Sequence, residues 1–161
     1  MLTAIMEEDR MSMDRLAHHR TADILLEPPR IVVIEGNEDH LWLIEQALKR
    51  SFPRSRTTMF SSGQEAVAFF RKKRRLRDAE QIELILLDID LPDYDSVKLV
   101  EYLKRSKLYR NIPIIILSDY ELPPAVQKAL EIGAEEYIVK PFDFHDFTDL
   151  LHRKLRQWIT P

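Results

Sequence analysis

The chain contains no cysteine and only three glycines among its 161 residues. Without cysteine it can have no disulfide scaffold, no thiolate metal site and no cysteine nucleophile. The scarcity of glycine argues against glycine-rich phosphate loops, and neither GxGxxG nor GxxxxGKS/T occurs in the sequence. If the protein holds a phosphate, other groups must hold it.

Long apolar runs are also missing, and none approaches the length of a membrane span. The amino terminus carries Glu7, Glu8 and Asp9, where a secretory signal has a basic start and an apolar core. We therefore expect a cytoplasmic protein with no membrane partner.

The net charge of −3 comes from residues 1–29, which hold six acids and three arginines, while the rest of the chain holds 21 acids and 21 bases. A neutral globular part gives no reason to expect nucleic-acid binding. The basic run at residues 71–77 falls at the end of a predicted helix. Cations are favourable there because they complement the helix dipole, so we do not read the run as a nucleic-acid site.

From residue 31 onward, short apolar runs alternate with segments whose apolar residues recur at helical spacing. This alternation is typical of repeated βα units, and hence of a doubly wound α/β fold with a five-stranded parallel sheet and helices on both faces. The predicted strands are residues 31–35, 57–60, 83–88, 113–117 and 136–139. The predicted helices span about 39–50, begin near 61 or 62, follow 95 or 96, span about 123–133 and follow 143.

Residues 1–29 have a different pattern from the rest of the chain. Their apolar residues could form one face of an acidic amphipathic helix: Leu2, Ile5, Met6, Met13, Leu16 and Ala17. A frayed tail and a helix that docks on a partner or on the protein itself both remain open. We predict a tail at residues 1–29, one domain at residues 30–158 and a short tail at residues 159–161.

Polar residues stand at the carboxyl ends of four predicted strands: Glu35, Asp88, Ser118 and Lys140. In an open parallel sheet these ends meet at one edge, where ligands bind. An oxygen nucleophile, a hydroxyl, a cation and a second acid that helps to seat Mg²⁺ together could hold a phosphoryl group.

The chain resembles the receiver domain of a two-component response regulator over residues 30–158, in its single-domain form. The matching pieces are residues 31–35 (IVVIE), 86–88 (LLD) with Leu91-Pro92, 112–118 (IPIIILS), Gly133-Ala134 and 137–141 (YIVKP). Residues 142–144 (FDF) also resemble regulators associated with phytochrome-type kinases. The resemblance implies a flavodoxin-like, CheY-like fold with strand order 2-1-3-4-5.

By the same resemblance, Asp88 accepts a phosphoryl group from the histidine of a sensor kinase or phosphotransfer protein. Ser118 then moves to contact the phosphate, Lys140 neutralises it, and the rotamer of Tyr137 reports the state. The implied Mg²⁺ cofactor is held by Glu35, by Asp88 and by the backbone carbonyl of Asp90. The implied output is contact with a downstream protein, and homodimerisation through the face with the fifth helix is a further expectation.

Three positions depart from the family pattern. Gly36 stands where the family has the acid that usually binds the metal directly, so Mg²⁺ affinity should fall. Asp119 stands where a small residue is usual and should repel a phosphoryl group. Residues 93–96 (DYDS) replace a glycine-containing loop.

These observations leave three functional hypotheses. The first is a phosphorylated single-domain regulator without enzymatic turnover. The second is a binding module that keeps the fold but is phosphorylated weakly or not at all. The third is a phosphatase of the haloacid-dehalogenase type, because residues 88–90 (DID) resemble its DxD motif. That motif normally ends the first strand of its domain, and an acidic pair should follow the lysine, so this hypothesis is the least favoured.

No metal-ligand spacing involves the histidines, and we assign them no role.

Overall fold

The computed structural model describes residues 28–72 and 82–159. The predicted amphipathic segment, apart from its last two residues, lies outside the described residues, as does the basic run beyond Lys72. The domain boundaries proposed from the sequence therefore stay predictions. Within the described residues no helix is both long and apolar enough to cross a membrane.

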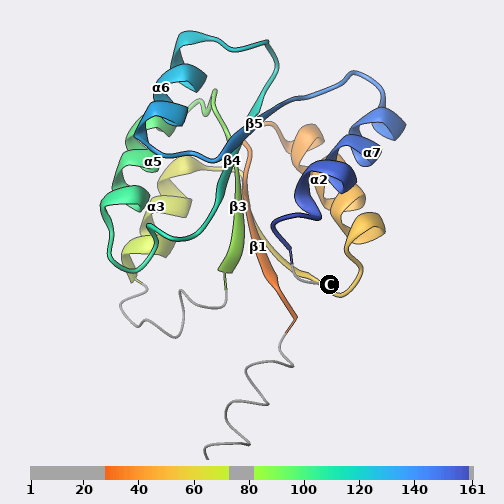
Figure 1. Ribbon diagram of the computed structural model, residues 1–161, viewed down its shortest axis with the longest axis horizontal. Coiled ribbons are helices and arrows are strands. Elements are labelled where there is room, and N and C mark those ends of the chain that lie inside the picture. Colours follow the sequence, from red (N-terminus) through yellow and green to blue (C-terminus); the bar gives the residue numbers. More distant parts are fainter. Residues whose placement is uncertain (1–27, 73–81, 160–161) are drawn as a thin grey trace, which may run out of the picture.

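Five parallel strands form one sheet in the order β2-β1-β3-β4-β5, as the resemblance implied. Figure 1 shows the sheet edge-on between two layers of helices. The strands are β1 (Arg30–Ile34), β2 (Arg56–Phe60), β3 (Ile82–Asp88), β4 (Ile114–Ser118) and β5 (Glu136–Val139). Each prediction therefore agrees with its strand to within one residue at either end.

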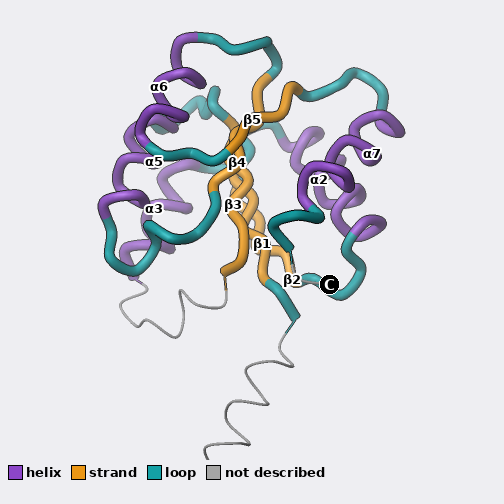
Figure 2. The backbone as a smooth tube through the Cα atoms, viewed as in Figure 1, coloured by secondary structure: helices purple, strands orange, loops and turns teal. Residues whose placement is uncertain are grey.

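Helices connect the strands, and the chain path in Figure 2 alternates regularly between strand and helix. The helices are α2 (Glu38–Ser51), α3 (Gly63–Lys72), α5 (Ser96–Arg105), α6 (Pro124–Ile132) and α7 (Phe144–Leu155). Each helix begins within two residues of its predicted start. Asp95 caps α5, Asp143 caps α7, and Pro123 occupies the N-cap of α6.

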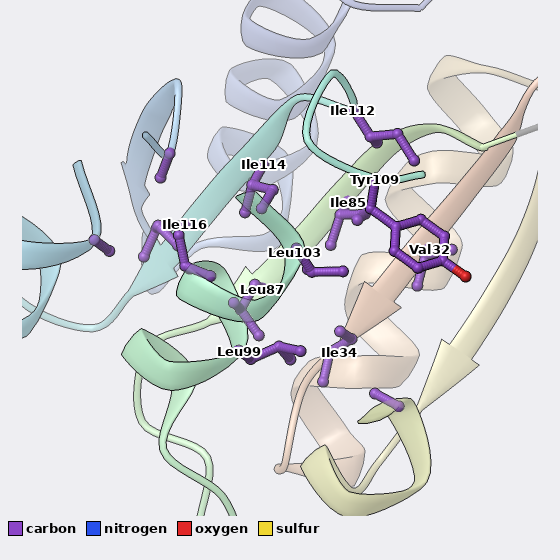
Figure 3. Close-up of a cluster of buried hydrophobic side chains, with 14 of the residues drawn as sticks. Val32, Ile34, Ile85, Leu87, Leu99, Leu103, Tyr109, Ile112, Ile114 and Ile116 are labelled. Atoms are coloured by element: carbon purple, nitrogen blue, oxygen red, sulfur yellow. The ribbon is translucent and has the colours of Figure 1, made fainter. Parts of the chain in front are cut away.

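Two apolar cores flank the sheet because alternate strand residues point to opposite faces. Val32 and Ile34 pack with α3, α5 and α6, whereas Ile31 and Val33 pack with α2 and α7. Figure 3 shows the first of these cores, in which side chains of β1, β3 and β4 meet Leu99 and Leu103 of α5. Because β3 is covered on both faces, it is an almost continuous apolar run.

Candidate functional site

Parallel pairing brings the predicted polar residues to one edge of the sheet. In the register of the central strands Ile34 pairs with Leu87, and Asp88 pairs with Leu117. Ser118 pairs with Val139, so Lys140 follows directly at the same edge. Glu35 lies one residue beyond β1, and its N–H donates to the carbonyl of Phe60 over 3.0 Å, which continues the ladder and fixes its position.

Lys140 is the centre of this cluster. Its Nζ donates to Oε2 of Glu35 over 3.0 Å and lies 3.2 Å from Nδ1 of His40. Oδ1 of Asp119 lies 3.4 Å from the same nitrogen, and Oδ1 of Asp88 lies 3.7 Å from it. Only 7% of the Lys140 side chain is exposed, so its interactions with the buried Glu35 and Asp88 carboxylates are little screened by water.

Asp88 is buried at the end of β3, and its surroundings hold it in place. Its Oδ1 accepts the N–H of Asp90 over 3.2 Å, and its carbonyl accepts the hydroxyl of Ser96 over 2.7 Å. Burial, followed by the charge of Glu35, raises the pKa of Asp88 to about 6, although Lys140 acts in the opposite direction. Asp88 is therefore ionised at neutral pH, with a weaker preference for the charged form than an aspartate in water.

The neighbouring charges shift two further groups. Burial and the charges of Asp88 and Asp119 raise the pKa of Asp90. For Lys140, burial acts to lower the pKa, but Asp88, Glu35 and Asp119 outweigh it and raise the pKa overall. Lys140 is thus fully charged, and the carboxylates around it outnumber it.

Ser118 ends β4 and is buried, but its hydroxyl is engaged by the following loop. It donates to the carbonyl of Tyr120 over 2.8 Å and accepts the N–H of Tyr120 over 3.1 Å. Tyr137 lies on β5, half-buried against the core formed with α5 and α6. Both residues occupy the positions expected from the sequence, and the roles proposed for them stay predictions.

The side chains available for a magnesium ion form an incomplete set. Each oxygen of Glu35 already accepts a hydrogen bond, Oε1 from the N–H of Asn37 at 3.0 Å and Oε2 from Lys140. At Gly36 an added Cβ would lie 2.4 Å from Cδ of Pro92, so the space that a side chain would need is filled. Among the described residues no three His, Asp or Glu side chains form a ligand group. The residues present therefore do not fit a magnesium site of ordinary affinity.

In the DYDS segment between β3 and α5, the side chains of Asp93, Asp95 and Ser96 each have a hydrogen-bond partner. The Asp93 carboxylate accepts the hydroxyl of Ser62 over 2.7 Å and the N–H groups of Gly63 and Gln64 over 2.9 and 3.1 Å. It thereby caps α3 from another part of the chain. Asp95 caps α5, and Ser96 binds the carbonyl of Asp88, so this loop is tied to the site and to two helices.

Sequence reasoning missed His40, which lies in the first turn of α2 against Lys140. A signal did exist, because a helix that begins just after Glu35 must start at the same edge of the sheet. His40, Lys140 and Asp119 line a cavity of about 370 Å³ together with Tyr120 and Phe142. Both aromatic side chains are strongly exposed at its rim.

The comparisons with known proteins agree with this geometry. The model of the response regulator receiver domain matches residues 31–152. The rice two-component response regulator ORR11 (Oryza sativa subsp. japonica) is 27% identical over 128 residues, which cover 80% of this chain and 82% of that protein. The rice response regulator-like protein PRR1, from the same subspecies, is 38% identical over 73 residues, or 45% of this chain, and the match covers only 14% of its length.

Among solved structures, the phosphorylated cyanobacterial phytochrome response regulator RcpA superposes with a TM-score of 0.72 at 24% identity. The superposition covers 81% of this chain and 94% of that one. At this identity the superposition shows that the two proteins share a fold, and it shows nothing more. Asp88 here ends β3, the third strand in sequence, and residues 142–144 (FDF) follow Lys140, so the arrangement differs from the one that the phosphatase hypothesis requires.

Proposed function

Because the chain belongs to the response regulator receiver family, we propose that it is a single-domain signalling protein that accepts a phosphoryl group on Asp88. The donor would be a phosphohistidine of a sensor kinase or phosphotransfer protein, and the output would be contact with a downstream protein in the cytoplasm. The match to ORR11, a two-component response regulator, supports the receiver role. The fold shared with RcpA makes a phytochrome-type kinase the first donor to test.

The observation that carries this proposal is the buried pair of Asp88 and Lys140, whose Oδ1 and Nζ lie 3.7 Å apart. An ionised Asp88 oxygen can attack phosphorus, forming an O–P bond while the P–N bond of phosphohistidine breaks and the imidazole nitrogen keeps the electron pair. Lys140 would offset the charge that the phosphoryl group brings. Ser118 would have to release the main chain of Tyr120 before its hydroxyl could reach the phosphate.

Receiver domains generally use Mg²⁺ for this transfer. We propose that Mg²⁺ binds weakly to this chain, because Glu35 is engaged by Lys140 and Gly36 supplies no carboxylate. The steps proposed for Asp88, Lys140 and Ser118 therefore use only side chains of the protein.

The test is labelling of the full chain with acetyl phosphate in the presence of Mg²⁺. We expect an adduct that is stable in acid and labile in base, located at Asp88 by mass spectrometry and absent in Asp88→Asn. The matched control is Asp149→Asn, which removes one exposed carboxylate of α7 and should leave labelling unchanged. Equal labelling of Asp88→Asn and the wild type would show the proposal to be wrong.

A second candidate is a binding module that acts without phosphorylation, and the closed space at Gly36 favours it. This function predicts no response to beryllofluoride and Mg²⁺ in the NMR spectrum, and partner binding that Asp88→Asn leaves unchanged. A saturable beryllofluoride response that Asp88→Asn abolishes would exclude it.

A further inference from the structure

The ammonium group of Lys140 has three N–H donors and four acceptor side chains around it. Glu35 and His40 take two donors, at 3.0 and 3.2 Å, and both come from the β1–α2 side of the site. One donor is left for the other side, where Asp119 at 3.4 Å is nearer than Asp88 at 3.7 Å. The unphosphorylated site thus has two carboxylates for one remaining donor.

The place of Asp119 is built into the fold. The preceding residue, Ser118, is paired within the sheet, and its hydroxyl holds both the N–H and the carbonyl of Tyr120. The backbone on either side of Asp119 is therefore fixed. The Asp119 side chain is less constrained than this backbone. It is 47% exposed, and within the described residues it forms an ion pair with Lys140 alone. The carboxylate can turn into water at little cost, which Glu35, fully buried, cannot do.

We propose that Asp119 is an internal substitute for the phosphoryl group, and that it competes with that group for the third donor of Lys140. A phosphoryl group on Asp88 needs this donor, so Asp119 must leave Lys140 before the modified site is fully paired. Asp119 thereby sets how readily the site accepts phosphoryl groups and their analogues. It acts through Lys140 and is a positioning residue, without contact to the reacting atoms. This inference rests on the proposed function.

The experiment compares Asp119→Asn with Glu121→Gln in the full chain. Both variants remove one carboxylate from the same loop, but Glu121 is exposed and is not among the partners of Lys140. Beryllofluoride affinity is measured by ¹⁹F NMR at saturating Mg²⁺, and the rate of labelling by acetyl phosphate is measured in parallel. Urea unfolding of each variant checks that a change in stability is not the cause.

We expect Asp119→Asn to raise both the affinity and the rate by about twofold to fivefold, because one half-exposed charge pair has roughly that effect. Glu121→Gln should stay near the wild type. The gain should shrink as the salt concentration rises, since mobile ions screen a half-exposed carboxylate.

The outcomes separate this inference from the proposed function. If the wild type binds beryllofluoride and Asp119→Asn behaves like Glu121→Gln, the competition by Asp119 is overturned and phosphorylation of Asp88 stands. If neither the wild type nor Asp119→Asn binds the analogue or forms an adduct at Asp88, the proposed function fails and the inference fails with it.

Discussion

Nζ of Lys140 donates a hydrogen bond over 3.0 Å to Oε2 of Glu35, although 105 residues separate the two in the chain. The Glu35 side chain has no exposed surface. This ion pair links the end of β1 to the segment that follows β5, although β3 and β4 lie between these two strands in the sheet.

Removing Lys140 should therefore leave a buried charge without its partner. We expect Lys140→Met to lower the free energy of unfolding by about 3–5 kcal/mol. Urea unfolding at neutral pH measures this. The double variant Lys140→Met/Glu35→Gln should recover part of the loss, because it removes one of the two buried carboxylates, Glu35 and Asp88, that Lys140 neutralises. A double variant no more stable than Lys140→Met would contradict this account.

The raised pKa of Asp88 predicts a pH-dependent stability. The pKa is 3.8 for an ordinary aspartate and about 6 for Asp88. Between these values the folded protein binds more protons than the unfolded chain, so the free energy of unfolding falls as the pH rises through this window. At pH 7.5 Asp88→Asn should be more stable than the wild type by about 1–3 kcal/mol. The gain should nearly vanish at pH 4, and a gain of equal size at both pH values would count against the assignment.

Two substitutions at Gly36 should have the same effect on stability but different effects on Mg²⁺ affinity. A Cβ at this position would lie 2.4 Å from Cδ of Pro92, so Gly36→Ala and Gly36→Asp should each destabilise the protein by about 1–3 kcal/mol. Only Gly36→Asp adds a carboxylate, and we expect it alone to raise Mg²⁺ affinity, by about tenfold in calorimetric titration. Equal affinities in the two variants would show that another residue limits metal binding.

Asp93 should stabilise α3 from outside that helix. Because it accepts three hydrogen bonds at the start of α3, Asp93→Ala should cost about 1–2 kcal/mol in urea unfolding, and Asp93→Asn should cost less. The hydrogen bond from Ser62, followed by that from Gln64, lowers the pKa of Asp93. Its contribution is therefore present above about pH 4 and is lost as the pH falls through the lowered pKa. Asp93→Ala with wild-type stability at pH 7 would show that the cap contributes nothing.

Much of the fold could be predicted because its signals are local and repeated. Apolar runs separated by amphipathic segments identified all five strands, and the helix starts followed from side chains such as Asp95 and Asp143 that bind the N–H groups just after them. The strand order was not derivable from these patterns. It came from the resemblance to the family, because periodicity reports which face a residue occupies and not which strand lies beside it.

The sequence by itself determined that Glu35, Asp88, Ser118 and Lys140 meet at one edge, because parallel strands place their carboxyl ends together. Only the tertiary structure decided which acceptors Lys140 binds, that His40 is one of its neighbours, and that Pro92 fills the space at Gly36. Those contacts depend on loop conformations and side-chain rotamers. Residues far apart in the chain fix them together, so no local pattern in the sequence records them.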